Sequence, residues 1–161
     1  MIFVCIGTQI YQFNRLLKKL DDLCAVGTIT DCVFAQIGAS DYVPQHYQYE
    51  KFMSEEDFLK MQRKANLIIS HGGTGALIGA LKLGKPVIAV PRLHKYGEHS
   101  DDHQLQVCEV LEQEQYLRVV WNMEELEIVI RETQKNPTTK EYNRPSNILS
   151  IIDEFIQNVN Q

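Results

Sequence analysis

The sequence predicts an α/β protein with a doubly wound parallel sheet, and two observations support this fold class. Short apolar segments, of the length of buried strands, alternate along the chain with longer segments of helical period. In addition, residues 65–92 combine a buried strand, a glycine-rich loop, a helix, a turn and a second buried strand. Six strands that alternate with helices in this way predict one parallel sheet with helices on both faces.

The unit at 65–92 is the clearest part of the pattern. Residues 67–69 are apolar, as a buried parallel strand requires, and 87–90 form a second strand of the same kind. Residues 71–75 are too small and flexible for the interior of a strand or helix, so we expect a loop there. Residues 76–83 are good helix formers, and Gly84 is a natural C-terminal stop.

The segments on either side of this unit follow the same alternation. Before it we expect strands at 2–6, 32–37 and 47–52, a helix over 13–24, and a helix that begins after the N-cap Ser54. After it we expect helices over 101–112 and 124–133 and a strand at 116–120. The helix over 13–24 has an apolar stripe at helical spacing, made of Phe13, Leu16, Leu17, Leu20, Leu23 and Cys24.

The chain is expected to hold one main domain, at residues 1–135. A proline-containing linker at 136–146 follows, and then a helix over 147–161. The helix is amphipathic, so we expect it to pack on the domain or on a partner. Its apolar residues are Ile148, Ile151, Ile152, Phe155 and Ile156.

Composition narrows the class of protein. The chain has 161 residues, enough for a substantial core, and a net charge of −5, which argues against a nucleic-acid partner. No stretch reaches the ~18 apolar residues of a membrane span, and the first residues lack the basic lead of a signal peptide. The cysteines form no C-x-x-C pair, so Cys5, Cys24, Cys32 and Cys108 are expected to be buried, reduced thiols of a cytoplasmic protein.

Residues 71–75 are predicted to bind a diphosphate. They follow a strand and precede a helix, where free N–H groups and the helix dipole favour an anion. The turn at Gly7–Thr8 ends at the same edge of the sheet. The loop has no P-loop lysine, and Gly73-Thr74-Gly75 lacks the third glycine of a dinucleotide fingerprint, so neither common nucleotide motif applies.

The order of the motifs resembles a known family. The motifs are Ile6-Gly7-Thr8, Gln36-Ile37-Gly38, Ser70-His71-Gly72-Gly73-Thr74-Gly75, Gly84-Lys85-Pro86, Pro91-Arg92 and Asp102-His103-Gln104. Together they are similar to the glycosyltransferase family 28 C-terminal domain, the donor-binding half of GT-B enzymes. Within it, the chain looks like the small catalytic subunits of two-chain enzymes, both bacterial exopolysaccharide transferases of PssE type and the soluble subunit of the eukaryotic dolichol-linked GlcNAc transferase. The resemblance implies a single Rossmann-like GT-B C-terminal half.

The resemblance also implies which residues bind the donor. His71 is the implied catalytic residue, because it would donate to a phosphate oxygen and help the leaving group to depart. Phe52 and Met53 would line a uracil pocket, and Gln104 would contact the sugar. The implied donor-binding set is Gly7, Thr8, Phe52, Met53, Ser70, His71, Gly72, Gly73, Thr74, Gly75, Arg92, Asp102, His103 and Gln104.

Each of these roles has a structural alternative. His71 can be a satisfied structural histidine, Phe52 can belong to the core, and residues 102–104 can be an ordinary acidic first turn of a helix. We expect a basic rim for a phosphate-bearing lipid acceptor, formed by Arg92, Lys95 and His99. The alternative is that these residues are solvated loop charges.

Two further expectations concern the ribose and metals. Many GT-B donor sites carry a glutamate eight residues after the histidine, where it holds the ribose hydroxyls. In this chain that position is Gly79, so ribose recognition must come from elsewhere. No metal site is expected, because the nearby residues lack the spacing of metal ligands: His94, Glu98, His99 and His103.

The implied activity is that of an inverting hexosyltransferase subunit. The donor would be a UDP-sugar and the acceptor a polyprenyl-diphosphate-linked saccharide, in capsule or exopolysaccharide biosynthesis, with no cofactor. Because the chain starts at the first strand of the donor half, we expect a membrane-anchored partner subunit to supply the acceptor half and to recruit the chain to the inner face of the membrane. The alternatives are a non-catalytic nucleotide-sugar-binding regulatory subunit and, more distantly, a nucleotide-binding oxidoreductase.

Overall fold

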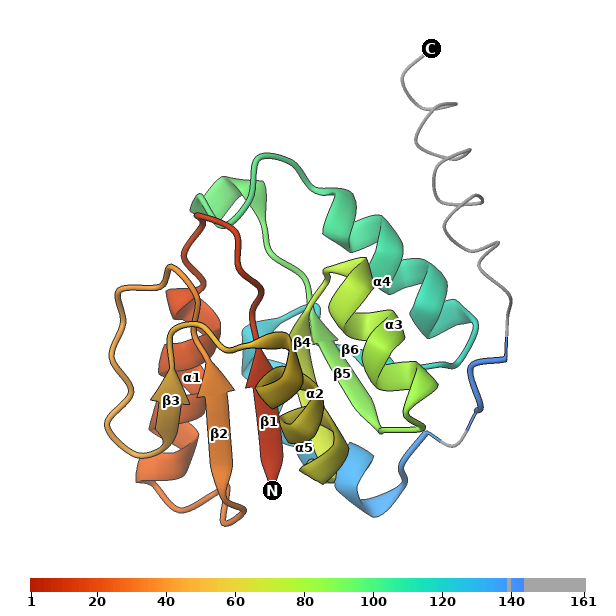
Figure 1. The fold of residues 1–161 in the computed structure, drawn as a ribbon, viewed down its shortest axis with the longest axis horizontal. Helices are drawn as coiled ribbons and strands as arrows, with labels where there is room; N and C mark the ends of the chain where they lie inside the picture. The colour runs from red at the N-terminus through yellow and green to blue at the C-terminus, as the bar shows by residue number, and fades with distance from the viewer. Residues whose placement is uncertain (139, 144–161) are drawn as a thin grey trace.

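The computed structural model describes residues 1–138 and 140–143, and this part of the chain is built on one six-stranded parallel sheet (Figure 1). The strand order is β3-β2-β1-β4-β5-β6, and every neighbouring pair is parallel. The strands are β1 (Ile2–Cys5), β2 (Val33–Gln36), β3 (Gln48–Glu50), β4 (Leu67–His71), β5 (Val87–Val90) and β6 (Arg118–Val119). The prediction of a doubly wound α/β fold is therefore confirmed.

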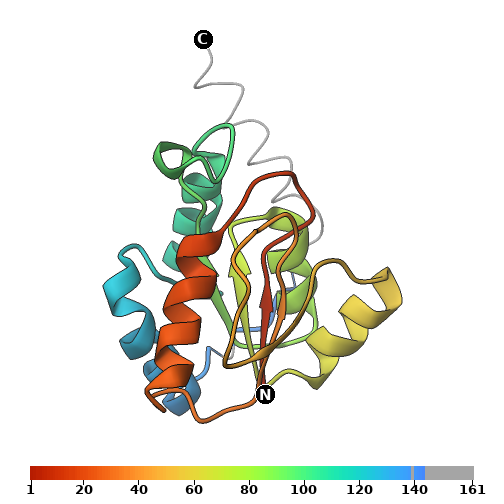
Figure 2. The same ribbon diagram turned by 90° about the vertical axis from the view of Figure 1, so that its left-hand side faces the viewer.

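Helices cover both faces of this sheet (Figures 1 and 2). α1 and α5 pack on one face, while α2, α3 and α4 pack on the other. The helices are α1 (Asn14–Ala25), α2 (Glu55–Lys64), α3 (Thr74–Lys82), α4 (His103–Gln113) and α5 (Leu126–Lys135), with short 3-10 turns η1 (His94–Tyr96) and η2 (Met123–Glu125). Ser54 caps α2 as predicted, since its side chain accepts from the Asp57 amide at 3.1 Å.

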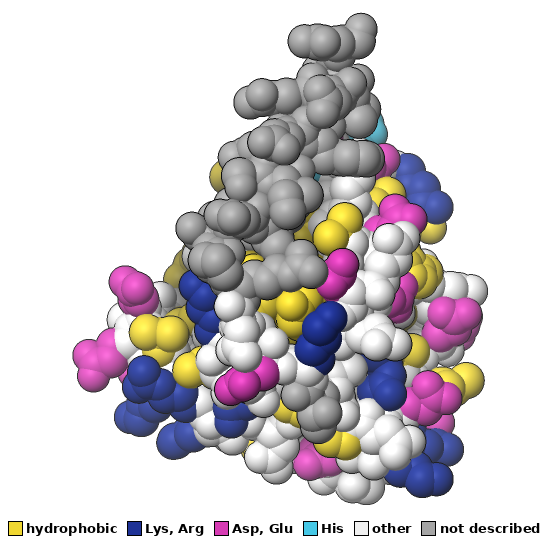
Figure 3. Space-filling view, turned by 90° about the vertical axis from the view of Figure 1, so that its right-hand side faces the viewer, with side chains coloured by type: hydrophobic (Ala, Val, Ile, Leu, Met, Phe, Trp, Pro, Cys, Tyr) yellow, Lys and Arg dark blue, Asp and Glu magenta, His cyan; other side chains and the backbone are white. Residues whose placement is uncertain are grey.

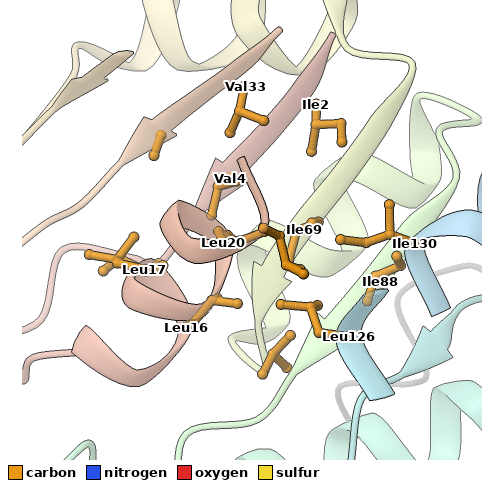
Figure 4. Close-up of a cluster of buried hydrophobic side chains, with 14 of the residues drawn as sticks. Ile2, Val4, Leu16, Leu17, Leu20, Val33, Ile69, Ile88, Leu126 and Ile130 are labelled. Atoms are coloured by element: carbon orange, nitrogen blue, oxygen red, sulfur yellow. The ribbon is translucent and has the colours of Figure 1, made fainter. Parts of the chain in front are cut away.

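The alternation of residues along each strand divides the core into two layers. Ile2 and Val4 of β1 point to the α1 and α5 side, where Leu20 and Leu126 meet them (Figure 4). The intervening Phe3 of β1 packs on the opposite side, against α2 and α3. Both faces of the central strands are thus buried, which explains their continuous apolar sequences.

The strand order places a crevice between β1 and β4. The chain winds from β1 outward through β2 to β3, then crosses back to β4 beside β1 and continues outward through β5. The loops that follow β1 and β4 therefore leave the sheet side by side and turn toward opposite faces. Ligands of open parallel sheets bind at this switch point, outside the carboxyl ends of the strands.

Several expected boundaries are wrong. His71 is the last residue of β4, and Thr74 and Gly75 open α3, so the loop expected at 71–75 shrinks to Gly72 and Gly73. The helix expected at 101–112 begins at His103. Of the cysteines expected to be buried, Cys24 is half-buried and Cys32 is exposed, just before β2.

Part of the expected C-terminal organisation lies outside the described residues. The helix expected over 147–161 falls entirely there, as does most of the second half of the linker. Within the described part, residues 140–143 contact the domain, because the ring centroids of Tyr142 and Tyr116 lie 5.2 Å apart. On the face shown in Figure 3, the described acidic and basic side chains are interspersed and form no continuous basic patch.

Candidate functional site

A cavity of about 630 Å³ lies at the switch point, which is the size range of small-molecule ligand sites. Its walls come from the loops after β1 and β4, the first turns of α2, α3 and α4, and the end of β2. Lining residues among the sequence-predicted set are Gly7, Thr8, Met53, His71, Gly72, Gly73, Thr74, Gly75, His103 and Gln104.

The His71 ring is fixed between two glycines. A Cβ on Gly7 would lie 2.7 Å from the His71 Nε2, and one on Gly73 would lie only 2.2 Å from the same atom. Gly7 also has φ +82°, a left-handed conformation that other residues rarely adopt. Both positions therefore need glycine to make room for the ring, and the predicted closeness of the β1 and β4 loops is confirmed.

The protonation state of His71 differs from the one that a hydrogen-bond donor to a phosphate oxygen needs. Burial lowers the pKa of His71 to about 4, helped by the nearby positive charge of Arg92. Its Nδ1 lies 3.3 Å from the Cys5 main-chain oxygen, which can only accept, so the proton of the neutral ring belongs on Nδ1. Nε2 is then a bare acceptor. His71 can donate to a phosphate oxygen through Nε2 only as an imidazolium.

The N-terminus of α3 supplies the remaining anion-binding groups. The N-cap residue Gly73 has no side chain, so nothing on it caps the first-turn N–H groups of α3. The residues that carry those N–H groups, from Thr74 onward, line the cavity. The Gly72 amide is not part of this set, because it donates to Gln104 Oε1 at 3.0 Å. An anion in the cavity would thus meet a helix N-terminus and the His71 ring.

Gln104 joins two loops. Its Oε1 accepts from the amides of Gly72 and Arg92, both at 3.0 Å, and the side chain is 7% exposed. The oxygen is therefore not free for a sugar hydroxyl. The predicted contact between Gln104 and a sugar can involve only the amide nitrogen as a donor.

The expectation that Arg92 forms a basic rim is wrong. Its side chain is 1% exposed and does not line the cavity. The guanidinium donates to the main-chain oxygens of Ile6, Tyr11 and Glu98, which fastens the loop after β1 to the loop after β5. Arg92 acts on the cavity through its charge beside His71 rather than by contact with solvent.

Other predicted residues also lie away from the cavity wall. Ser70 is fully buried in β4, and Asp102 accepts from the His94 amide at 2.9 Å. Phe52 is 55% exposed and does not line the cavity, so the alternative that placed it in the core is wrong as well. Lys95 is exposed and lies over the Tyr96 ring, with 4.9 Å from Nζ to the ring centroid.

The sequence pattern assigned no structural role to two polar residues that hold the loops of the site in place. Gln36 Oε1 accepts from the Gly7 amide at 3.2 Å, and its Nε2 donates to the oxygens of Gly7 and Lys51 at 2.9 and 3.0 Å. It therefore fixes the turn after β1. Glu98 is fully buried and binds Arg15 through both carboxylate oxygens at 2.9 Å. The available signal for Gln36 was a polar residue at the carboxyl end of a buried strand.

The loop before α4 brings a second imidazole to the cavity. His99 lines the wall, and its Nδ1 lies 3.1 Å from the Asp101 carboxylate. His103 also lines the wall, one residue before Gln104.

The described residues contain neither a metal-ligand cluster nor a membrane-spanning helix. In residues 1–138 and 140–143, no three His, Cys, Asp or Glu side chains come together as a group that could hold a metal ion. Within the same residues, no helix is both long enough and apolar enough to span a bilayer.

One protein-family model matches nearly the whole chain. The model of the glycosyltransferase family 28 C-terminal domain matches residues 1–159. The UDP-N-acetylglucosamine transferase subunit ALG13 of Homo sapiens is 30% identical over 125 residues, which are 72% of this chain. This chain spans about a tenth of the length of that human protein, since the match covers 10% of it.

Solved structures share the fold at low sequence identity. A solution structure of ALG13 has a TM-score of 0.58 at 17% identity, covering 92% of this chain and 91% of that one. A crystal structure of Os79 from O. sativa in complex with UDP has a TM-score of 0.60 at 17% identity, covering 97% of this chain and 40% of that one. These likenesses establish the same Rossmann-like arrangement that GT-B glycosyltransferases have.

Proposed function

Because the chain belongs to the glycosyltransferase family 28 C-terminal domain family, we propose that it binds the UDP-sugar donor of a glycosyl transfer reaction. The observation that carries this proposal is the cavity at the β1–β4 switch point, where His71 stands between two glycines at the start of α3. The arrangement suits an anion held by N–H groups and one imidazolium.

The donor orientation follows from the chemistry of the walls. The diphosphate lies at the N-terminus of α3, beside His71, where the positive groups are. The uracil lies at the apolar end of the cavity near Met53 and Phe58, and the sugar lies near His103 and Gln104. When the bond between the sugar and the diphosphate breaks, charge grows on the departing UDP. The N–H groups and protonated His71 stabilise that charge, without a metal.

The proposal for the acceptor and the partner subunit is supported by the names of similar proteins and by the family resemblance. The human relative is by its name a UDP-N-acetylglucosamine transferase subunit, which supports a heteromeric enzyme with a UDP-sugar donor. We propose a polyprenyl-diphosphate-linked acceptor, inversion at the transferred sugar, and a membrane-anchored partner that recruits this chain from the cytoplasm. A role in capsule or exopolysaccharide synthesis, as in the PssE-type enzymes that the chain resembles, belongs to the same proposal.

Calorimetric titration of the chain with UDP tests the first part. We expect saturable binding of UDP, with ADP and GDP weaker, and the same affinity in EDTA as in manganese. His71→Asn should weaken binding, while Lys18→Ala, on the exposed side of α1, should leave it unchanged. A parent chain that binds no uridine nucleotide contradicts the proposed function.

A transfer assay tests the second part. With a radiolabelled UDP-sugar and a polyprenyl-linked acceptor in detergent, we expect product only when a co-purifying partner is added. Full transfer by the isolated chain contradicts the two-subunit proposal. Binding without turnover in the reconstituted pair favours the alternative, a non-catalytic nucleotide-sugar-binding subunit.

A further inference from the structure

We propose that Glu55 binds the ribose hydroxyls of the donor and sets a preference for ribonucleotides over 2′-deoxyribonucleotides. The inference rests on the proposed function, since it assigns a residue to a nucleotide in the same cavity. The walls of the cavity differ in chemical character. One end holds the His71 ring and the α3 N-terminus, and the other holds Met53 and Phe58.

Glu55 stands at the second, apolar end. Among the described residues that line the cavity it is the only one with a carboxylate. A carboxylate repels a diphosphate, so Glu55 is not a phosphate ligand. Between the diphosphate and the base of a nucleoside diphosphate lies the ribose, whose adjacent hydroxyls are two hydrogen-bond donors. An ionised carboxylate is an acceptor at both oxygens and matches such a pair.

The first turn of α2 leaves only Glu55 for this role. The three acidic residues of that turn are Glu55, Glu56 and Asp57. Asp57 is occupied by the helix cap, since the Ser54 hydroxyl donates to its carboxylate at 2.7 Å. Glu56 is exposed and does not line the cavity. The structure gives the Glu55 carboxylate no hydrogen bond or ion pair with any described residue, so both of its oxygens are open to a ligand.

Position 79 does not compete for the ribose. A Cβ on Gly79 would lie 3.7 Å from Gln62 Oε1, and neither residue lines the cavity. We therefore assign to Glu55 the ribose contact that position 79, which carries no side chain, does not supply.

The test compares UDP with 2′-deoxy-UDP by titration of the chain and three variants. The parent is expected to bind UDP about tenfold more tightly than 2′-deoxy-UDP. Glu55→Ala should weaken the binding of UDP more than that of 2′-deoxy-UDP, because UDP loses the acceptor of both hydroxyls and 2′-deoxy-UDP loses only that of the 3′-hydroxyl, so the preference for UDP should disappear. Glu55→Gln, which keeps one acceptor oxygen, should give an intermediate ratio. Glu56→Ala removes the same charge from the same helix turn and should behave as the parent does.

The outcomes separate this inference from the proposed function. A Glu55→Ala variant that keeps the parent's preference for UDP overturns the inference and leaves UDP binding intact. A parent that binds both nucleotides equally overturns it too. A parent that binds neither nucleotide overturns the proposed function, and the inference falls with it. Circular dichroism on each variant confirms that a loss of binding is not a loss of fold.

Discussion

The Nδ1 atom of His71 lies 3.3 Å from the main-chain oxygen of Cys5, across the junction between β4 and β1. This contact determines which nitrogen of the ring reaches the cavity. With the proton on Nδ1, the atom between Gly7 and Gly73 is Nε2, and it carries no hydrogen while the ring is neutral. His71, which the resemblance implied as a hydrogen-bond donor to a phosphate, must therefore gain a proton before Nε2 can donate.

Donor binding is accordingly expected to be accompanied by proton uptake at His71 near neutral pH. The pKa of His71 is lowered to about 4 by burial and by Arg92, and a bound diphosphate would raise it. Calorimetry with a UDP-sugar in two buffers of different ionisation enthalpy measures the uptake directly, because a doubly esterified diphosphate does not titrate near neutrality. Affinity should rise as the pH falls from 8 to 6. Equal heats in both buffers would contradict proton uptake, and His71→Asn should abolish it.

The same pKa shift predicts an acid-dependent loss of stability. In the unfolded chain His71 has a pKa near its ordinary value of 6.5, whereas in the fold it is about 4. Between these values the unfolded state binds a proton that the native state does not, so stability falls as the pH falls from 6.5 to 4. The loss is at most roughly 3 kcal/mol. Urea unfolding at several pH values should give a flatter curve for His71→Asn than for the parent in this window, and parallel curves would contradict the shift.

Gly73→Ala should disable the site without unfolding the domain. Position 73 has ordinary backbone angles, φ −75° and ψ 120°, so the added methyl group is not strained by the backbone. Its conflict is with His71 Nε2 at 2.2 Å, and the ring must move out of place. We expect UDP affinity to fall at least tenfold, as titration will show. Gly79→Ala in the same helix is the control: it should keep UDP affinity and gain about 0.5–1 kcal/mol of stability.

Glu98→Ala should destabilise the fold by about 3 kcal/mol, because it leaves Arg15 without its ion-pair partner and removes the acceptor of the Leu93 amide. The loop that carries His99 should loosen as well. Urea unfolding measures the change. The surface pair of Lys19 and Glu124, at 2.8 Å, is a matched control, and Glu124→Ala should cost less than ~1 kcal/mol. Equal effects of the two substitutions would show that the buried pair contributes nothing special.

The parallel sheet and its alternation with helices could be predicted because the individual strands and helices depend on local composition. Buried strands such as β1 and β5 are apolar at every position, and the stripe of α1 repeats at helical spacing. The boundaries at the site were harder to place. His71 and Gly75 look like loop residues, yet the first completes the ladder of β4 and the second lies in the first turn of α3, so tertiary pairing overrides local preference there.

The polar contacts of the site could not be read from the sequence. Gln36 and Gly7 are 29 positions apart, and Gln104 and Gly72 are 32 apart, so no local pattern announces either bond. A charged residue in a loop is usually solvated, and Arg92 looked like part of a rim for that reason. Its burial follows from three main-chain oxygens that converge on the guanidinium, an arrangement that only the folded chain creates.

The two hydrogen bonds that Gln104 accepts, from the amides of Gly72 and Arg92, have a consequence for any attempt to change which sugar the proposed site accepts. Gln104 stands where the sugar is proposed to lie, so it is an obvious position to randomise. Substitution there would release two loops at once, and altered preference would be confounded with a disordered phosphate site. His103 and Val107 also line the cavity, and neither side chain bridges those loops. Libraries built on these two positions would vary the lining of the cavity while the scaffold of the site stays intact.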